Sequence, residues 1–191
     1  MTKTDRRIIR TRQFIMQAFE ELIKQKPFDK ISVNEIADLA NINRSTFYLH
    51  YVDKYALLDE YIDELLKDLY EQSGVLLQEK EFSGVEQCLS VVLNCLYEKR
   101  DIFKILFKRV NNPYFQPRFK SVIASIIAES TQPSDIEKTT ESEFLIQVKT
   151  SALAGIIEWW LTDNANISVD AMIKNVSRVF FKLEDVKVSA K

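Results

Sequence analysis

Residues 31–54 read ISVNEIADLANINRSTFYLHYVDK, and this stretch carries the clearest structural signals in the N-terminal part of the chain. Ser32 and Glu35 have the spacing of a capping box, in which the two side chains satisfy backbone amides at the start of a helix. A short helix therefore begins after Ser32, and its apolar residues face the core: Val33, Ile36, Ala37 and Leu39. Asn41 then lies where the chain must turn sharply, because asparagine tolerates a positive φ better than other non-glycine residues. This half of the stretch predicts a helix followed by a tight turn.

The second half of the stretch predicts another helix, over residues 44–51, with Asn43 as its N-terminal cap. Two helices of about eight residues, joined by a turn of about four, have the proportions of a helix-turn-helix, whose second helix enters the DNA major groove. The apolar residues that hold the two helices together are Ile36, Ala37, Ile42 and Phe47. The remaining side chains of the second helix therefore face outward.

These outward side chains suit contact with DNA. Arg44 can reach a guanine edge or a phosphate, and Ser45 and Thr46 can reach either. Tyr48 can donate a hydrogen bond to a phosphate while its ring lies along the DNA backbone. We therefore expect this helix to read DNA.

A fourth helix is expected from Lys54 to about Leu77, with Asp53 as its cap. Its buried side carries Leu57, Leu58, Tyr61, Leu65 and Leu69. Lys54 would then lie at the start of this helix, where its charge and the free backbone amides together form an anion site.

The rest of the chain also reads as helix. Only three glycines and four prolines occur among 191 residues, so strands and tight turns have few of the residues they need. Capping residues Ser83, Thr140 and Ser168, together with Pro117, mark later helix starts. The sequence predicts an all-α protein of about nine helices, over residues up to 25, 33–39, 44–51, 54–77, 84–99, 101–110, 117–129, 140–163 and 168–183. The polar stretch TQPSDIEKTTES between two of them is the clearest loop.

Charge is distributed unevenly along the chain. The formal net charge is −2, yet residues 1–12 have a local balance of +4, from Lys3, Arg6, Arg7, Arg10 and Arg12 against Asp5. A basic arm on a mildly acidic protein suggests that one end meets a polyanion. The alternative is a solvated, frayed terminus.

Composition indicates an ordinary soluble protein, 46% hydrophobic and 28% charged. No run of 18 apolar residues and no apolar signal core occurs, so no membrane partner is expected. Cys88 and Cys95 lie seven residues apart on one predicted helix, too far apart for a disulfide, and are interpreted as packing residues of a reduced, cytoplasmic protein.

The helix-turn-helix stretch resembles the TetR/AcrR family of transcriptional regulators. Family members typically read alanine-glycine-valine-serine, a variable residue, glycine-threonine, an aromatic or leucine, tyrosine, a variable residue, histidine, phenylalanine, and lysine three residues on. Here ANINRSTFYLHYVDK matches at Ala40, Thr46, Phe47, Tyr48, His50 and Lys54. It departs from the family pattern at five positions. Asn41 and Ser45 stand where glycine is usual, Ile42 where valine is usual, Asn43 where serine is usual, and Tyr51 where phenylalanine is usual. The match is dense over residues 8–60.

The resemblance implies two domains: a three-helix DNA-binding domain over residues 1–55, and a ligand-sensing and dimerisation domain over residues 56–191. Residues 61–185 resemble the second domain more loosely. The best local match is LAGIIEWWLTDNANISVDAMI, similar to a C-terminal pattern of Firmicutes-type TetR-like regulators. By the same resemblance, His50 is associated with packing and with the phosphate backbone.

The last two predicted helices suit a homodimer interface. Small residues on neighbouring turns of the helix over 140–163 would let two copies approach closely, and the last helix would complete a four-helix contact. Expected dimer contacts are Ser151, Ala152, Gly155, Trp159, Met172, Val176, Val179 and Phe180. The alternative is that these are core residues of a monomer. A dimer is favoured because one recognition helix contacts too few bases to select a site in a genome.

The resemblance also implies a switch, in which a small-molecule effector in the second domain shifts the fourth helix and releases a repressor from a near-palindromic operator. An apolar pocket could be lined by aromatic residues, with Glu158 or Lys149 giving it polarity: Tyr97, Phe103, Phe107, Phe144, Trp159 and Trp160. The alternative is that these aromatic residues, which recur at helical spacing, are ordinary core residues that contact no ligand. The identity of the effector stays open.

The sequence also bears on two rival classes of function. An enzyme is disfavoured because the sequence has no Gly-rich phosphate loop, no G-x-S-x-G and no H-E-x-x-H, and its single histidine, His50, lacks the partners of a metal site, so no cofactor or metal is expected. The second is a helical co-regulator or activator that acts through a protein partner. Salt separates this class from a DNA-binding protein, because phosphate contacts weaken steeply with added salt.

Overall fold

The computed structural model describes residues 3–78, 85–108, 115–130, 140–164 and 166–184. Within these ranges the regular secondary structure consists of nine α-helices and one 3₁₀ turn, so the prediction of an all-α protein is confirmed. The elements are α1 (Lys3–Gln25), η1 (Phe28–Lys30), α2 (Val33–Leu39), α3 (Arg44–Tyr48), α4 (Lys54–Gln78), α5 (Val85–Glu98), α6 (Arg100–Lys108), α7 (Phe115–Ser130), α8 (Thr140–Asp163) and α9 (Val169–Glu184).

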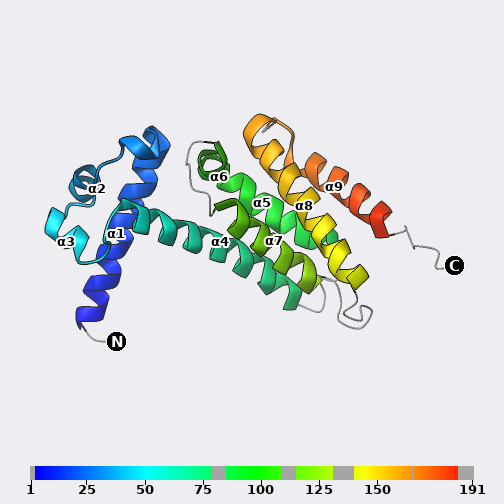
Figure 1. Cartoon of the computed structure of the whole chain (residues 1–191), viewed down its shortest axis with the longest axis horizontal. Helices are drawn as coiled ribbons and strands as arrows, with labels where there is room; N and C mark the ends of the chain where they lie inside the picture. The colour runs from blue at the N-terminus through cyan, green and yellow to red at the C-terminus, as the bar shows by residue number, and fades with distance from the viewer. Residues whose placement is uncertain (1–2, 79–84, 109–114, 131–139, 165, 185–191) are drawn as a thin grey trace.

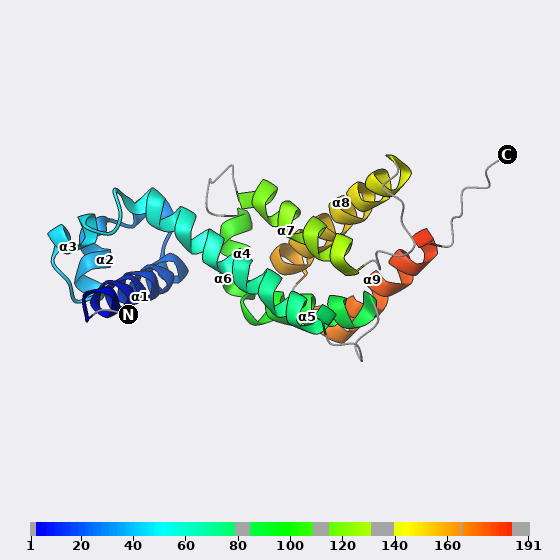
Figure 2. The same ribbon diagram turned by 90° about the horizontal axis from the view of Figure 1, so that it is seen from below.

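Helices α1, α2 and α3 form a group at one end of the molecule, and α4 runs from this group into a second one made of α5 to α9 (Figure 1). The view from below shows the same division (Figure 2). In the second group α4 packs against α5 and α7, α7 packs against α8, and α5 packs against α9. The two groups of helices are also in contact through α1, which packs against α6 of the second group.

The core runs without a break from α1 to α9. Near the junction of the two groups, the ring of Phe19 in α1 meets the ring of Tyr61 in α4 edge to face, with 5.5 Å between centroids. The expected domain boundary, between residues 55 and 56, falls inside the first turn of α4. The start of this helix is therefore part of the structure that holds the first three helices.

Most helix limits follow from the local signals that predicted them. Helix α1 ends before Pro27, Pro117 lies in the first turn of α7, and the Ser168 hydroxyl accepts a hydrogen bond from the amide of Ala171 at 3.3 Å. The predicted cap at Ser83 and most of the predicted loop over residues 131–142 lie outside the described residues. No helix in the described part of the chain is both long and apolar enough to span a lipid bilayer.

Candidate nucleic-acid interface

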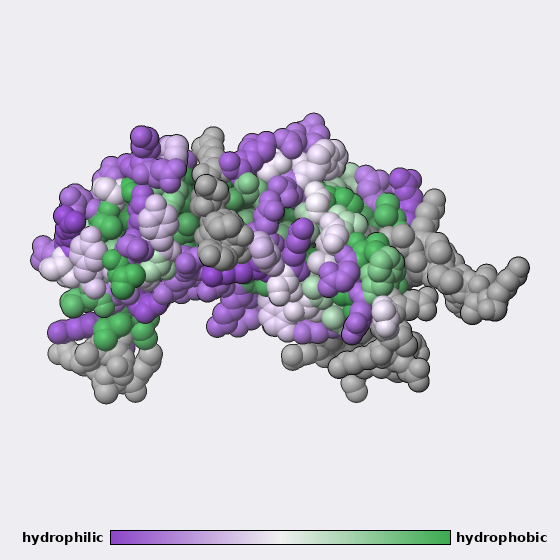
Figure 3. All heavy atoms as spheres, viewed as in Figure 1, coloured by the Kyte–Doolittle hydropathy of each residue, from purple (hydrophilic) through white to green (hydrophobic). Residues whose placement is uncertain are grey.

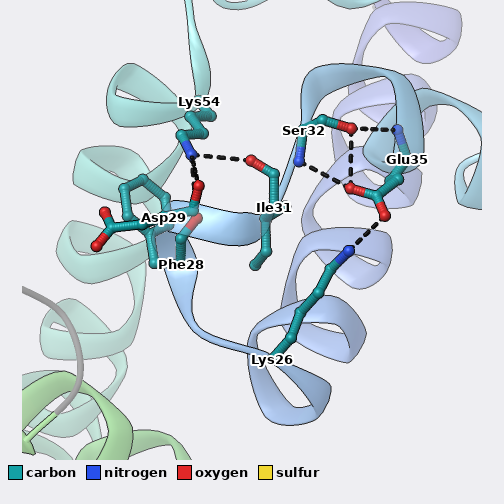
Figure 4. A network of polar contacts seen from close by, with 7 residues as sticks. All are labelled: Lys26, Phe28, Asp29, Ile31, Ser32, Glu35 and Lys54. Carbon is teal, nitrogen blue, oxygen red and sulfur yellow. Dashed lines mark hydrogen bonds and ion pairs between the residues drawn. The ribbon is translucent and has the colours of Figure 1, made fainter.

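A complete capping box sets the start of α2. The Ser32 amide donates to Glu35 Oε2 at 2.9 Å, and the Glu35 amide donates to Ser32 Oγ at 3.3 Å, as predicted. Lys26, the first residue after α1, adds a hydrogen bond from its ammonium group to the other Glu35 oxygen (Figure 4). Because one carboxylate contacts both segments, the direction of α2 is fixed relative to α1.

This arrangement makes stability depend on pH in a defined direction. The Lys26 ammonium, and then the Ser32 amide, lower the pKa of the Glu35 carboxyl from 4.5 to about 2. A carboxyl whose pKa is lower in the folded chain stabilises the fold above its unfolded pKa, and the contribution is lost as the pH falls through the folded pKa. We therefore expect Glu35→Gln to lower the free energy of unfolding at neutral pH, and its difference from the wild type to narrow as the pH falls from 4.5 to about 2.

Urea unfolding at neutral pH and at about pH 3 measures this narrowing. Glu21→Gln, which removes an exposed carboxylate of α1 outside the capping box, controls for the general loss of one negative charge. A difference between Glu35→Gln and the wild type that is the same at both pH values would contradict the prediction.

The turn between α2 and α3 depends on Asn41. Its φ is +53°, and within the described residues it is the one non-glycine residue with positive φ, as the sequence predicted. Asn43 occupies the N-cap position of α3 in an extended conformation, but its side chain makes no capping hydrogen bond. Helix α3 is also shorter than the predicted 44–51, because the chain tightens after Tyr48 and the Leu49 amide bonds to the Thr46 carbonyl at 3.2 Å. The predicted helix-turn-helix is therefore present with a short second helix.

The side chains predicted to meet DNA lie on the outer face of α3. Arg44, Ser45 and Tyr48 are exposed, and Thr46 is half-buried. The Arg44 guanidinium lies over the Tyr48 ring at 5.6 Å and its Nη2 lies 3.4 Å from the Tyr48 hydroxyl. On the opposite side Phe47 is fully buried and anchors the helix. Helix α3 thus presents a polar, cationic surface from a rigid support.

Lys54 does not form, with the amides at the start of α4, the open anion site that the sequence predicts. Its ammonium group donates to the backbone carbonyls of Phe28, Asp29 and Ile31 at 3.0, 3.1 and 2.8 Å (Figure 4). The amides at the start of α4 are also occupied, since Asp53 Oδ1 accepts from the amides of residues 55 and 56 at 2.9 and 2.8 Å. Both halves of the expected anion site therefore bind groups of the protein itself.

A polar cluster that the sequence analysis missed joins α1 and α4 behind α3. The Tyr51 hydroxyl donates to Glu60 Oε1 at 3.0 Å, and the Arg12 guanidinium forms an ion pair with the same carboxylate while lying over the Tyr51 ring at 5.4 Å. His50 is half-buried beside this cluster, and burial, followed by the positive charge of Arg12, lowers the pKa of its imidazole. A neutral, partly buried imidazole fits the packing role expected for His50. The cluster joins residues up to 48 positions apart, so no local sequence signal could have found it.

The basic arm is only partly available to a polyanion. Arg6, Arg7 and Arg10 are exposed on the first turns of α1, whereas Arg12 pairs with Glu60. The exposed arginines lie in the same group of helices as α3 (Figure 1). The arm therefore adds positive charge to the end of the molecule that carries the helix-turn-helix.

Comparison with known families agrees with this geometry. Residues 15–61 match the model described as bacterial regulatory proteins, tetR family. Residues 84–182, more than half of the chain, match the TetR model described as a transcriptional regulator C-terminal region. This chain belongs to the TetR family. The helix-turn-helix and the second group of helices are therefore the two parts of a TetR-family transcriptional regulator.

Individual relatives of this TetR-family chain are distant. It is 32% identical over 95 residues to the HTH-type transcriptional regulator YxbF of Bacillus subtilis, a match that covers 48% of this chain but spans only 25% of YxbF. It is 22% identical over 151 residues to the dhaKLM operon transcriptional activator DhaS of Lactococcus lactis, covering 76% of each chain. Among solved structures, a TetR transcriptional regulator from Streptococcus agalactiae superposes with a TM-score of 0.68 at 27% identity, covering 93% of this chain and 97% of that one.

The predicted dimer residues divide between two environments. Ser151, Gly155 and Trp159 are exposed along one face of α8, Ala152 is half-buried, and Val179 is exposed on α9. Met172 and Val176, by contrast, are each only 2% exposed, because this side of α9 packs against α5. Met172 and Val176 are therefore core residues of the single chain, which was the alternative to a role in the dimer interface. Phe180 has a side chain outside the described residues.

The predicted pocket aromatics are mainly core residues in this structure. Phe103 and Trp160 are fully buried, and Tyr97 stacks on Trp160 with 5.5 Å between ring centroids. Phe107 packs edge to face against two buried phenylalanines of α7, whereas Phe144 is 68% exposed on α8. Of the two expected polar residues, Lys149 is buried, and Glu158 accepts a hydrogen bond from Gln116 at 3.3 Å.

Proposed function

We propose that this protein is a dimeric transcription regulator that places α3 of each protomer in the major groove of double-stranded DNA. The observation that carries the proposal is the outer face of α3, where Arg44, Ser45 and Tyr48 are exposed on a helix anchored by buried Phe47. Such side chains supply base-edge and phosphate contacts. The exposed arginines of α1 add charge attraction to the same end of the molecule.

Dimerisation is supported by the outer faces of α8 and α9. Ser151, Gly155 and Trp159 follow one another at helical spacing on α8, and a Cβ added at Gly155 would meet no atom within 4 Å. Hydrophobic side chains gather on the molecular surface over α8 and α9 (Figure 3). A second copy packed there would bury Trp159, which is 47% exposed, together with Val179. A two-fold dimer would then place its α3 helices about 34–36 Å apart or at a longer spacing and would read a near-palindrome.

We further propose that this regulator is a repressor, and that it leaves its operator when a small molecule enters the second group of helices. Two buried hydroxyls in the described part of this group, Thr150 on α8 and Ser177 on α9, have no hydrogen-bond partner. A buried polar group without a partner is costly, and a bound ligand would relieve that cost. Because α4 packs against α5 and α7 and its Tyr61 ring also meets Phe19 of α1, a shift of this helix on binding would change the spacing of the two α3 helices.

A second candidate is an activator, or a co-regulator that works through a protein partner. It is favoured by the similarity to DhaS, which is named as the activator of the dhaKLM operon. An activator still binds DNA, whereas a co-regulator of this kind need not.

The experiment that tests the proposal is fluorescence anisotropy of the purified protein on labelled DNA from immediately upstream of its own gene and the neighbouring genes. We expect saturable binding whose affinity falls steeply with salt, by about 0.9 in the logarithm of K per logarithm of salt for each phosphate contacted. Tyr48→Ala should weaken binding to every sequence. If the folded wild type binds none of these DNAs, the DNA-binding proposal fails and the co-regulator is favoured. A reporter gene under the same DNA then separates repression from activation.

A further inference from the structure

We infer that Lys54 contributes to DNA binding as a positioning residue and not as a phosphate contact. In this assignment, its ammonium group holds the start of α4 against the η1 turn, and thereby sets the direction in which the α2–α3 pair presents its outer face. The inference rests on the proposed function, because it concerns the same DNA-binding surface.

The ammonium group of Lys54 has one hydrogen-bond acceptor in the protein for each of its donors. A lysine ammonium has three N–H donors and no acceptor. Lys54 Nζ lies within 3.1 Å of three carbonyl oxygens, those of Phe28, Asp29 and Ile31, which converge on it from one turn of chain (Figure 4). The same nitrogen lies 4.7 Å from the centre of the Phe28 ring, which adds a cation–π attraction. With these three bonds made, no N–H of Lys54 remains for a phosphate oxygen.

The three carbonyls belong to a turn of chain that is anchored in the core by Phe28 and Ile31. Phe28 and Ile31 are buried, so the η1 turn is held in the core and cannot swing outward with the lysine. Ile31 is followed directly by Ser32, the cap of α2, and α2 packs against α3. Lys54 therefore connects the first residue of α4 to the segment that leads into the helix-turn-helix. Loss of this connection would leave the part-buried carbonyls of Phe28 and Ile31, and the exposed carbonyl of Asp29, without their donor and free α4 to change its angle to α2 and α3.

Replacing Lys54 by methionine or by arginine separates the two roles. Methionine removes the charge and the three donors. Arginine keeps the charge, but its planar fork of donors cannot point at three carbonyls that converge on one atom. A phosphate contact, by contrast, tolerates arginine well. Lys30→Met, which removes an exposed lysine from the same turn and leaves the three bonds intact, is the matched control for loss of charge.

The measurement is DNA affinity of the full-length wild type and the three variants by fluorescence anisotropy across a salt series. We expect Lys54→Met and Lys54→Arg both to bind about tenfold more weakly or worse at every salt concentration, with the salt slope of the wild type. We expect Lys30→Met to stay close to the wild type. A folded fraction that is the same at every salt concentration, as circular dichroism across the series would show, lowers the affinity but leaves the slope unchanged, so the slope remains informative if a variant is destabilised.

Three results would overturn the inference: wild-type affinity in Lys54→Arg, wild-type affinity in Lys54→Met, or a salt slope in Lys54→Met that is smaller by about 1.8 for a dimer, the loss of one phosphate contact per protomer. Failure of the proposed function is a separate observation, since it would appear as the absence of salt-sensitive DNA binding in the wild type itself.

Discussion

Replacement of Trp160 by alanine is expected to lower the free energy of unfolding by about 3–5 kcal/mol. The Trp160 ring is 0% exposed, stacks on Tyr97, and donates from Nε1 to the Ile167 carbonyl at 2.9 Å. The substitution would leave a large cavity between helices and a carbonyl without its donor, and the surrounding structure can relax only partly. Urea unfolding followed by circular dichroism, at one protein concentration for all variants, measures the loss.

The neighbouring tryptophan is a matched control for this prediction. Trp159 is 47% exposed on the adjacent face of α8, so Trp159→Ala removes a side chain of the same size from the surface of the protomer. We expect it to leave the fold of the protomer intact but to raise the dissociation constant of the proposed dimer, which analytical ultracentrifugation would detect. If Trp160→Ala costs less than about 1 kcal/mol, Trp160 is not the core residue that the structure indicates.

Replacement of Arg44 by alanine is expected to weaken binding to the operator and to reduce discrimination against a mismatched site by about 1–3 kcal/mol. Arg44 is the first residue of α3, and the N-terminal residues of a recognition helix are those that contact base edges. Its guanidinium already lies on the Tyr48 ring, which restricts its orientation before DNA arrives. Anisotropy titrations with an operator and with single-base variants of it would measure both effects.

Arg44→Lys tests whether the contact is to a base or to a phosphate. A lysine keeps the charge but lacks the rigid, planar pair of donors with which an arginine matches guanine O6 and N7, so a base contact predicts weaker discrimination in this variant too. Equal loss of affinity for matched and mismatched sites in Arg44→Ala would show that Arg44 binds only the backbone of the DNA.

The parts of the fold that were predicted correctly are those set by short-range chemistry. Ser32 and Glu35, which form the capping box, are three residues apart. Helix α1 ends at Gln25, shortly before Pro27, and Asn41 adopts a positive φ that its own side chain makes tolerable. Apolar spacing likewise identified the buried side of α4, where Leu57, Leu65 and Leu69 are all buried, but it was wrong for Leu39 of α2, which is 43% exposed. Each of these effects acts within about one helical turn, so it can be read from neighbouring letters of the sequence.

The parts that were missed or misplaced involve partners far away in the chain. Met172 and Val176 were expected at a dimer interface, yet they pack inside the protomer against α5. A stripe of apolar residues has the same spacing whether it faces the chain's own core or a second copy, so periodicity cannot distinguish the two. Tyr51 stands where the family usually has phenylalanine, and only the structure shows that its hydroxyl meets Glu60 of α4.

Caps, turn residues and helical periodicity are local properties. They were therefore enough to predict an all-helical protein, a helix-turn-helix within residues 31–54, and the side chains of α3 that face outward. The partners of Lys54, by contrast, could be found only in the folded chain, since the three carbonyls that surround its ammonium group come from residues 23 to 26 positions earlier in the sequence. Hydrogen-bond partners at such distances are selected by the packing of whole helices, which places η1 beneath the start of α4, and no local pattern of residues encodes that packing.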